Sequence, residues 1–248
     1  RSSGRTTTYG TVAAAAAELF PPETVTLKDP KDWKLIGKPV KRLDTLDKLT
    51  GKQVFGADLT LPGMLNASIR ACPTFGGTLK SFDDSQVKAL PGVRAVLRVN
   101  EDAVAVVADT WWQAKTALDK LPLTWDPGPN ANVDSASIER MLEEGLTAKE
   151  AFVGNENGDA RAALEGAAKT VEAVYAYPYQ NHATMEPMNA TAVWTEDQCE
   201  VWCPTQNGES ALAAATAASG LPAEAVDVHK VHLGGGFGRR GQGVYVTQ

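Results

Sequence analysis

The sequence predicts an α+β protein in which short strands alternate with short helices. Apolar runs of roughly four to eight residues, rich in valine, recur between turn-forming glycines and prolines, as strands do. Amphipathic or alanine-rich stretches of helical length separate these runs. The composition, 43% hydrophobic and 22% charged, supplies enough apolar material for a sizeable core. The 248 residues can therefore form one large domain or two small ones.

The charge balance excludes some classes of partner. A net charge of −6 and a pI near 5.2 disfavour general binding to nucleic acid or to anionic membranes, which requires a positive field. No apolar run approaches the ~20 residues that span a bilayer. We expect neither a transmembrane segment nor a signal peptide in this chain. The sequence leaves the compartment open between a bacterial-type cytoplasm and periplasm.

The three cysteines, Cys72, Cys199 and Cys203, do not form an even disulfide framework. No histidine or further cysteine joins Cys199 and Cys203 at metal-ligand spacing, so we expect no protein-bound metal. Buried free thiols are the interpretation that the sequence favours.

The first predicted region, residues 1–50, contains one helix and a connecting arm. An alanine-rich stretch, Tyr9–Phe20, reads as a helix that Pro21 and Pro22 end. The following residues up to Thr50 are lysine-rich, contain further prolines and show no regular period, which predicts an extended arm.

The second predicted region, residues 51–128, is a compact α+β unit. Thr110 and Gln113 form a capping-box signature at the start of a helix, and Pro91-Gly92 predicts a turn. The predicted strands are Leu65–Arg70, Val93–Val99, Val104–Ala108 and Leu121–Trp125, and the predicted helices are Asp84–Leu90 and Thr110–Leu118.

The third predicted region, residues 129–248, follows the Pro- and Gly-rich linker Asp126–Asn130. A hairpin around Glu196-Asp197 and a helix of very small residues that ends at Gly220 are its clearest elements. The predicted helices are Ser135–Glu144, Asp159–Ala167 and Gly208–Ser219, and the predicted strands are Thr170–Tyr179, Ala192–Trp194, Cys199–Cys203 and Val226–Leu233.

A glycine-rich loop follows the last predicted strand. Gly234, Gly235, Gly236 and Gly238 place four glycines within five residues, directly before the pair Arg239-Arg240. Bare backbone amides and guanidinium groups both bind oxyanions, which indicates an anionic or strongly polar partner. The alternative is an ordinary glycine-rich connector between two core elements.

Two further polar groups lie at the ends of predicted elements, where sites are usually built. One is Gln180–His182 with Glu186, and the other is Pro204–Asn207. Each has a structural alternative: His182 can be an ordinary satisfied side chain, Asn207 a helix cap, and Glu186 the partner of Arg239 or Arg240.

The spacing Gly236-x-Gly238-x-x-Gly241 also matches the dinucleotide fingerprint and follows a strand. Gln242–Gln248 shows no convincing helix start, however, and the expected acidic residue would lie beyond Gln248. A dinucleotide-binding oxidoreductase therefore stays a minor alternative.

Three motifs, in this order and spacing, resemble the molybdenum-cofactor subunit of the xanthine dehydrogenase and aldehyde oxidase family. They are Gln180–Ala192, Pro204–Asn207 and Leu233–Arg240. The Met-Glu-Pro-Met-Asn wording of Met185–Asn189 and the double arginine are most similar to the beta subunit of isoquinoline 1-oxidoreductase and to related aldehyde dehydrogenases.

The resemblance implies a domain order and a chemistry. Residues 1–50 would end a preceding cofactor-domain segment, residues 51–128 would be an α/β hammerhead domain, and residues 129–248 would begin the molybdopterin-binding domain. The implied reaction oxidises an aldehyde or an N-heteroaromatic ring with water as the oxygen source. A molybdenum–pterin cofactor carries it out, and electrons leave through iron–sulfur clusters on a partner small subunit.

Carried over by position, the resemblance assigns cofactor binding to six residues. Gln206 would hydrogen-bond a molybdenum oxygen ligand, and the loop backbone would contact the pterin and the metal's ligands; the loop residues are Gly235, Gly236, Phe237, Gly238 and Arg239. Purine-oxidising relatives carry a substrate-binding glutamate where this chain has Gly241, which disfavours a purine.

The glutamate that serves this family as catalytic base is absent from this sequence. We therefore expect the chain to be an internal segment of a longer polypeptide, inactive by itself and completed by the remainder of that polypeptide. A non-catalytic binding or assembly segment of the same fold is the alternative.

Overall fold

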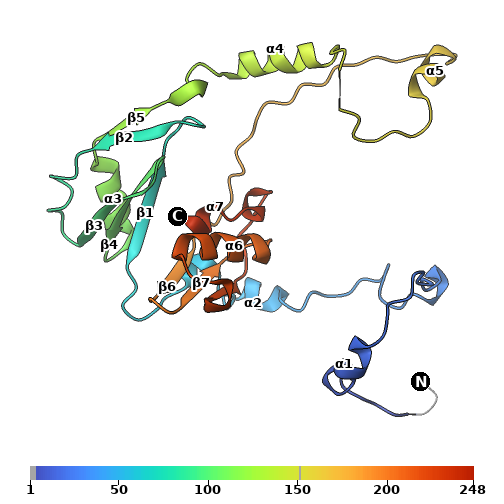
Figure 1. The fold of residues 1–248 in the computed structure, drawn as a ribbon, viewed down its shortest axis with the longest axis horizontal. Coiled ribbons are helices and arrows are strands. Elements are labelled where there is room, and N and C mark those ends of the chain that lie inside the picture. Colours follow the sequence, from blue (N-terminus) through green and yellow to red (C-terminus); the bar gives the residue numbers. More distant parts are fainter. Residues whose placement is uncertain (1–3, 151) are drawn as a thin grey trace. The chain divides into compact units, whose positions relative to one another are not determined.

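The computed structural model describes residues 4–150 and 152–248, and the chain divides into two units, residues 1–52 and 53–248. In the first unit the helices are α1 (Tyr9–Ala17) and α2 (Thr45–Leu49), with a single 3₁₀ turn at Pro30–Asp32 (Figure 1). Thr8 caps α1 by accepting a hydrogen bond from the amide of Thr11. No described residue of this unit is fully buried, so it has no core of its own.

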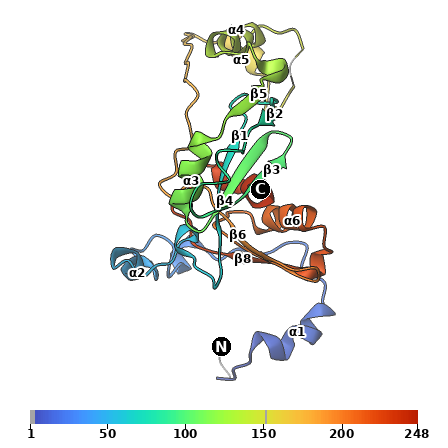
Figure 2. The same ribbon diagram turned by 90° about the vertical axis from the view of Figure 1, so that its left-hand side faces the viewer.

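The second unit begins with two antiparallel sheets and one helix. The larger sheet has the order β1-β4-β3, the smaller pairs β2 with β5, and α3 packs against β1 and β4 (Figure 2). The bounds are β1 Asn66–Ala71, β2 Thr78–Phe82, β3 Val93–Asn100, β4 Ala103–Ala108, α3 Trp111–Lys120 and β5 Leu123–Asp126.

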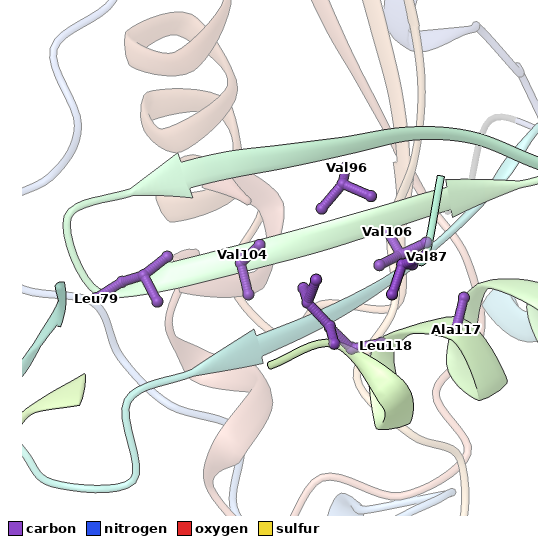
Figure 3. Packing of buried hydrophobic residues seen from close by; sticks show 8 residues of the cluster. Leu79, Val87, Val96, Val104, Val106, Ala117 and Leu118 are labelled. Carbon is purple, nitrogen blue, oxygen red and sulfur yellow. The ribbon is translucent and has the colours of Figure 1, made fainter. Parts of the chain in front are cut away.

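A valine-rich core holds these elements together. Val104 and Val106 on β4 face Ala117 and Leu118 on α3, as Figure 3 shows. Burying one such side chain contributes about 1.5–3 kcal/mol relative to leaving it exposed. The predicted capping box at Thr110 and Gln113 is present and begins α3.

The second unit ends with a mixed sheet of order β6-β7-β8, in which β6 and β7 form the predicted antiparallel hairpin and β7 and β8 run parallel. The crossover helix α6 packs on β7 and β8, and its alanines join the buried side chains of Cys199, Val201, Cys203 and Val226. The bounds are β6 Thr191–Trp194, β7 Cys199–Cys203, α6 Gly208–Ser219, β8 Val226–Lys230 and α7 Val244–Thr247.

Two helices lie between these sheets in the sequence, α4 (Ser135–Gly145) and α5 (Ala160–Glu165), and neither buries a residue. Single 3₁₀ turns occur at Gly56–Asp58, Gly128–Asn130, Ala223–Ala225 and Arg239–Gly241. Across the described residues, no helix is both long enough and apolar enough to cross a bilayer.

Five expectations about elements were wrong. The arm predicted to be extended up to Thr50 contains the short helix α2. Thr170–Tyr179 is exposed and pairs with no strand in the described chain. Alternating side-chain polarity predicts a strand only where a second strand is present to pair with it. Asp84–Leu90 forms turns, with Pro91 directly after it, instead of a helix. The sequence did not predict β2, and Gln242–Gln248 contains the short helix α7 despite its lack of a side-chain cap.

The predicted thiols are free, with Cys199 and Cys203 buried and Cys72 half-buried. In the described part of the chain, no group of three or more His, Cys, Asp or Glu side chains is arranged to hold a metal ion.

Candidate functional site

All three polar segments that the sequence singled out meet at Arg240, which is fully buried. Its Nε donates to the carbonyl of Gly235 at 2.7 Å, and its Nη1 donates to the carbonyl of Pro204 at 3.2 Å. Its Nη2 donates to the carbonyls of Glu186 at 2.7 Å and Pro187 at 3.2 Å. One guanidinium group therefore joins the glycine-rich loop, the end of β7 and the segment before β6.

The carboxylate of Glu186 is the charged partner of Arg240, at 3.0 Å between Oε2 and Nη2. It also accepts hydrogen bonds from the amides of Gly234 at 2.8 Å and Ala57 at 3.0 Å. Both carboxylate oxygens thus have hydrogen-bond partners. A buried charge requires such partners, and this side chain is only 6% exposed. The structural alternative for Glu186 is correct, and its partner is Arg240.

Sequence reasoning missed the contribution of the segment at Ala57. Its amide reaches Glu186 across 129 residues of chain, and an isolated parallel bridge joins Phe55 to His232 nearby in the fold. Gly56 lies so close to Asn189 and Pro204 that a Cβ atom there would clash with the side-chain oxygen of Asn189. The sequence around Gly56, Val54-Phe55-Gly56-Ala57, carries no local signal for this contact.

The glycine-rich loop adopts backbone conformations that few residues tolerate. Gly235 has φ +103°, Phe237 has φ +49° and Gly238 has φ +90°. A bulky residue at positive φ is strained, and such strain clusters at functional sites. A hydrogen bond from the amide of Arg239 to the carbonyl of Gly236 at 2.8 Å closes the turn.

The outer side of this turn presents unpaired donors. Within residues 4–150 and 152–248, the amides of Gly236, Phe237 and Gly238 donate to no other group of the chain. Phe237 is 73% exposed. We call these three residues, together with Gln206, the exposed side of the loop.

Gln206 lies beside the loop because both segments are tied to Arg240. Its amide donates to the carbonyl of Arg240 at 3.0 Å, and a Cβ built on Gly236 would stand 3.1 Å from its side-chain oxygen. The next residue, Asn207, caps α6 by accepting from the amide of Ser210 at 3.1 Å. The helix-cap alternative for Asn207 is therefore correct, and it leaves the Gln206 side chain exposed toward the loop.

His182 contacts the loop from the segment before β6. Its Nδ1 lies 2.7 Å from the carbonyl oxygen of Phe237, and a Cβ on Gly238 would lie 3.7 Å from its ring. The imidazole thereby supports the strained turn at Phe237, in agreement with the structural alternative for this histidine.

Next to the buried Arg240–Glu186 pair, Tyr245, Cys199 and Cys203 belong to an apolar core cluster. The hydroxyl of Tyr245 donates to the carbonyl of Pro204 at 3.0 Å, and burial raises the pKa of Tyr245 above its ordinary value. Burial likewise raises the pKa of the Cys199 and Cys203 thiols, which keeps them protonated and unreactive near neutral pH.

The dinucleotide alternative finds no support in this geometry. Its third glycine should allow a helix to pack closely on the strand, yet a Cβ on Gly241 would meet nothing within 4 Å. A 3₁₀ turn, Arg239–Gly241, stands where the fingerprint requires the start of a long helix.

Comparisons with known proteins match this region and much of the remaining chain. A family model for the molybdopterin cofactor-binding domain matches residues 143–248. A nicotinate dehydrogenase subunit of Pseudomonas putida is 31% identical over 73% of this chain and 16% of its own length. The isoquinoline 1-oxidoreductase beta subunit of Brevundimonas diminuta is 29% identical over 87% of this chain and 29% of its own length.

Solved structures share the fold. Quinoline 2-oxidoreductase from Pseudomonas putida matches with a TM-score of 0.62 at 21% identity, covering 84% of this chain and 32% of that chain. Aldehyde oxidoreductase from Desulfovibrio desulfuricans matches with a TM-score of 0.63 at 17% identity, covering 90% of this chain and 30% of that chain. The chain thus spans about a third or less of the length of each protein compared.

Proposed function

Since this chain carries the molybdopterin-binding domain of the xanthine dehydrogenase and aldehyde oxidoreductase family, we propose that it serves the large subunit of a molybdenum hydroxylase by holding the pterin cofactor. The observation that carries this proposal is the group of amides at Gly236, Phe237 and Gly238, which have no partner among the described residues and of which Gly236 lies beside Gln206. Successive unpaired amides on a fixed backbone suit an anionic group.

The residues present fit such a group. The exposed side of the loop has no Cβ at Gly236 or Gly238, so a ligand can approach the backbone closely. Gln206, Gly235 and Arg239 complete the set that would hold the cofactor. When bound, the molybdenum–pterin group supplies the redox chemistry, and the protein supplies its binding and orientation.

Gln206 would act as a fixed hydrogen-bond donor to an oxygen ligand of the metal. Its backbone amide is tied to Arg240, and Asn207 directly after it caps α6, so the side chain projects from a rigid junction. A donor that is positioned before the reaction loses no energy to reorganisation as charge develops on its partner.

The proposed substrate is an aldehyde or an N-heteroaromatic ring, and the proposed electron acceptors are iron–sulfur clusters on a small subunit. The relatives named for isoquinoline and nicotinate support the ring class. A membrane-bound aldehyde dehydrogenase of Gluconacetobacter polyoxogenes, 28% identical over 99% of this chain and 34% of its own length, supports the aldehyde class. Gly241 offers no carboxylate for a purine.

We further propose that residues 51–128 are an α/β hammerhead domain, that residues 129–248 begin the cofactor domain, and that residues 1–50 end a preceding cofactor-domain segment. The separate valine-rich core of β1, β3, β4 and α3 supports the first assignment. The catalytic base would come from the remainder of the large subunit.

Gly236→Val in the complete large subunit tests the proposal. The new side chain would occupy the space between the loop and Gln206, where even a Cβ stands only 3.1 Å from the glutamine oxygen. We expect most of the molybdenum and pterin to be lost while the circular dichroism spectrum is kept. A wild-type protein that assembles with its partners but contains no molybdenum would instead favour the non-catalytic assembly role.

A further inference from the structure

Arg240 and Glu186 fix the glycine-rich loop from both ends of its exposed turn. Before the turn, Glu186 accepts from the amide of Gly234 and Arg240 donates to the carbonyl of Gly235. After the turn, the carbonyl of Arg240 accepts from the amide of Gln206 at 3.0 Å and from the hydroxyl of Thr205 at 3.3 Å. The loop residues between these ties are Gly236–Arg239.

The same residue therefore relates the two halves of the proposed site to each other. Arg240 holds the loop through its side chain and holds Gln206 through its backbone carbonyl. A shift of its guanidinium would change the separation between the Gln206 side chain and the unpaired amides of the turn. A displacement of about 1 Å in a site of this kind can lower the rate on the order of 10²-fold.

Stability alone does not explain why an arginine is buried here. Both charges of the pair lose their hydration, and an apolar pair of similar volume is often as stable. What the guanidinium adds is a planar set of donors in fixed directions, here to the carbonyls of Gly235, Pro204 and Glu186. A lysine ammonium, a point charge on a flexible stem, cannot reproduce these directions together.

We propose that Arg240 is a positioning residue for the cofactor site: it sets the placement of the Gly236–Gly238 amides relative to Gln206. This inference rests on the proposed function for its ligand, while its structural part concerns only residues of this chain. Arg240 itself touches no ligand, because its side chain is fully buried.

The test compares Arg240→Lys with wild type in the complete large subunit, and it measures amide hydrogen exchange and molybdenum per chain. We expect exchange at the hydrogen-bonded amides of Gly234, Arg239 and Gln206 to accelerate about tenfold, the effect of losing one charge-assisted hydrogen bond, with no change on β4. Molybdenum per chain should fall several-fold. Arg94→Lys is the matched control, because Arg94 forms a similar fork with Asp109 at an exposed position.

Two results would overturn the inference. One is a variant whose loop exchange and molybdenum content equal those of wild type. The other is a uniform acceleration over α6, β7 and the loop, which would make Arg240 a general stabiliser only. If Arg240→Lys does not fold, Glu186→Gln gives the same decision. Gly234 and Ala57 donate to different oxygens of the Glu186 carboxylate, and glutamine has only one acceptor oxygen in place of these two.

Different results would contradict the proposed function and the positioning role of Arg240. A wild-type protein without molybdenum contradicts the proposed function. A wild-type protein with molybdenum and an Arg240→Lys variant that keeps it contradict only the positioning role.

Discussion

The two sides of the glycine-rich loop differ in where their polar groups find partners. On the buried side, Arg240 and Glu186 satisfy each other and the surrounding backbone within the chain. On the exposed side, the amides of Gly236–Gly238 have no partner in the described residues and the backbone is strained at Phe237. Groups that folding satisfies hold the loop in place, and groups that it leaves unsatisfied are available to a ligand.

This difference separates stability from binding. Changes on the buried side should lower the free energy of unfolding, whereas a change on the exposed side should lower cofactor binding or turnover and affect stability only where it strains the backbone. Four predictions test that separation, beginning with the largest expected effect.

Glu186→Ala should destabilise the chain by about 3–5 kcal/mol, because it leaves the buried Arg240 charge without its partner. Urea unfolding followed by circular dichroism measures this. Asp109→Ala is the control, since it breaks the exposed pair with Arg94 and should cost about 0–1 kcal/mol. Equal losses of unfolding free energy in the two variants would show that burial does not increase the contribution of the Arg240–Glu186 pair to stability.

Gln206→Ala in the complete large subunit should lower turnover per bound molybdenum by ~10²–10³ while the thermal midpoint changes little. Thr110→Ala gives the opposite pattern: it removes the N-cap of α3 and should cost about 1 kcal/mol with unchanged turnover. If Gln206→Ala lowers the midpoint and keeps the turnover, Gln206 belongs to the buried, structural side.

The sequence predicted those elements whose signals are local. The helix α6 was predicted at Gly208–Ser219, where it occurs, because a capping residue precedes it and Gly220 ends it at φ +71°. The capping box of α3 is equally local. Thr170–Tyr179 carries a strand-like alternation as well, yet a strand requires a neighbour, and alternation cannot say whether one exists.

The site followed the same rule. The glycines and the polar segments were visible in the sequence, and the structure brings Gln206 beside Gly236. The sequence could not show whether Arg239 or Arg240 is the partner of Glu186, because adjacent arginines differ only in the direction that a strained turn gives them. The bond from Ala57 to Glu186 joins residues 129 apart, which no local pattern reports.

Gly238→Ala should destabilise the chain by about 1–2 kcal/mol through backbone strain alone, because φ is +90° there while a Cβ meets only ordinary contacts at 3.7 Å. Gly241→Ala is the matched control two residues from Arg239. It has open space and no positive φ, so we expect it to be neutral or stabilising by about 0.4–1 kcal/mol. Thermal unfolding of both variants decides this, and equal midpoints would contradict a strained turn.

The smallest expected effect is a loss of stability in alkali that originates beneath the loop. Burial raises the pKa of Tyr245, Cys199 and Cys203 in the folded chain, because their charged forms lose hydration there. At neutral pH all three are protonated in both states, so their contribution to stability is complete. As pH rises past the ordinary values of about 8.5 for cysteine and 10 for tyrosine, the unfolded chain releases these protons first, and stability falls through the raised folded pKa.

Urea midpoints measured from pH 7 to pH 11 should therefore be level at first and then decline. Tyr245→Phe removes one of the three groups and should make the decline shallower, at the cost of the hydrogen bond to Pro204. Tyr175→Phe is the control, since Tyr175 is 78% exposed and the same substitution there should leave the slope unchanged. A decline with equal slope in wild type and Tyr245→Phe would place its origin outside the buried side of the loop, among the other groups that titrate in alkali.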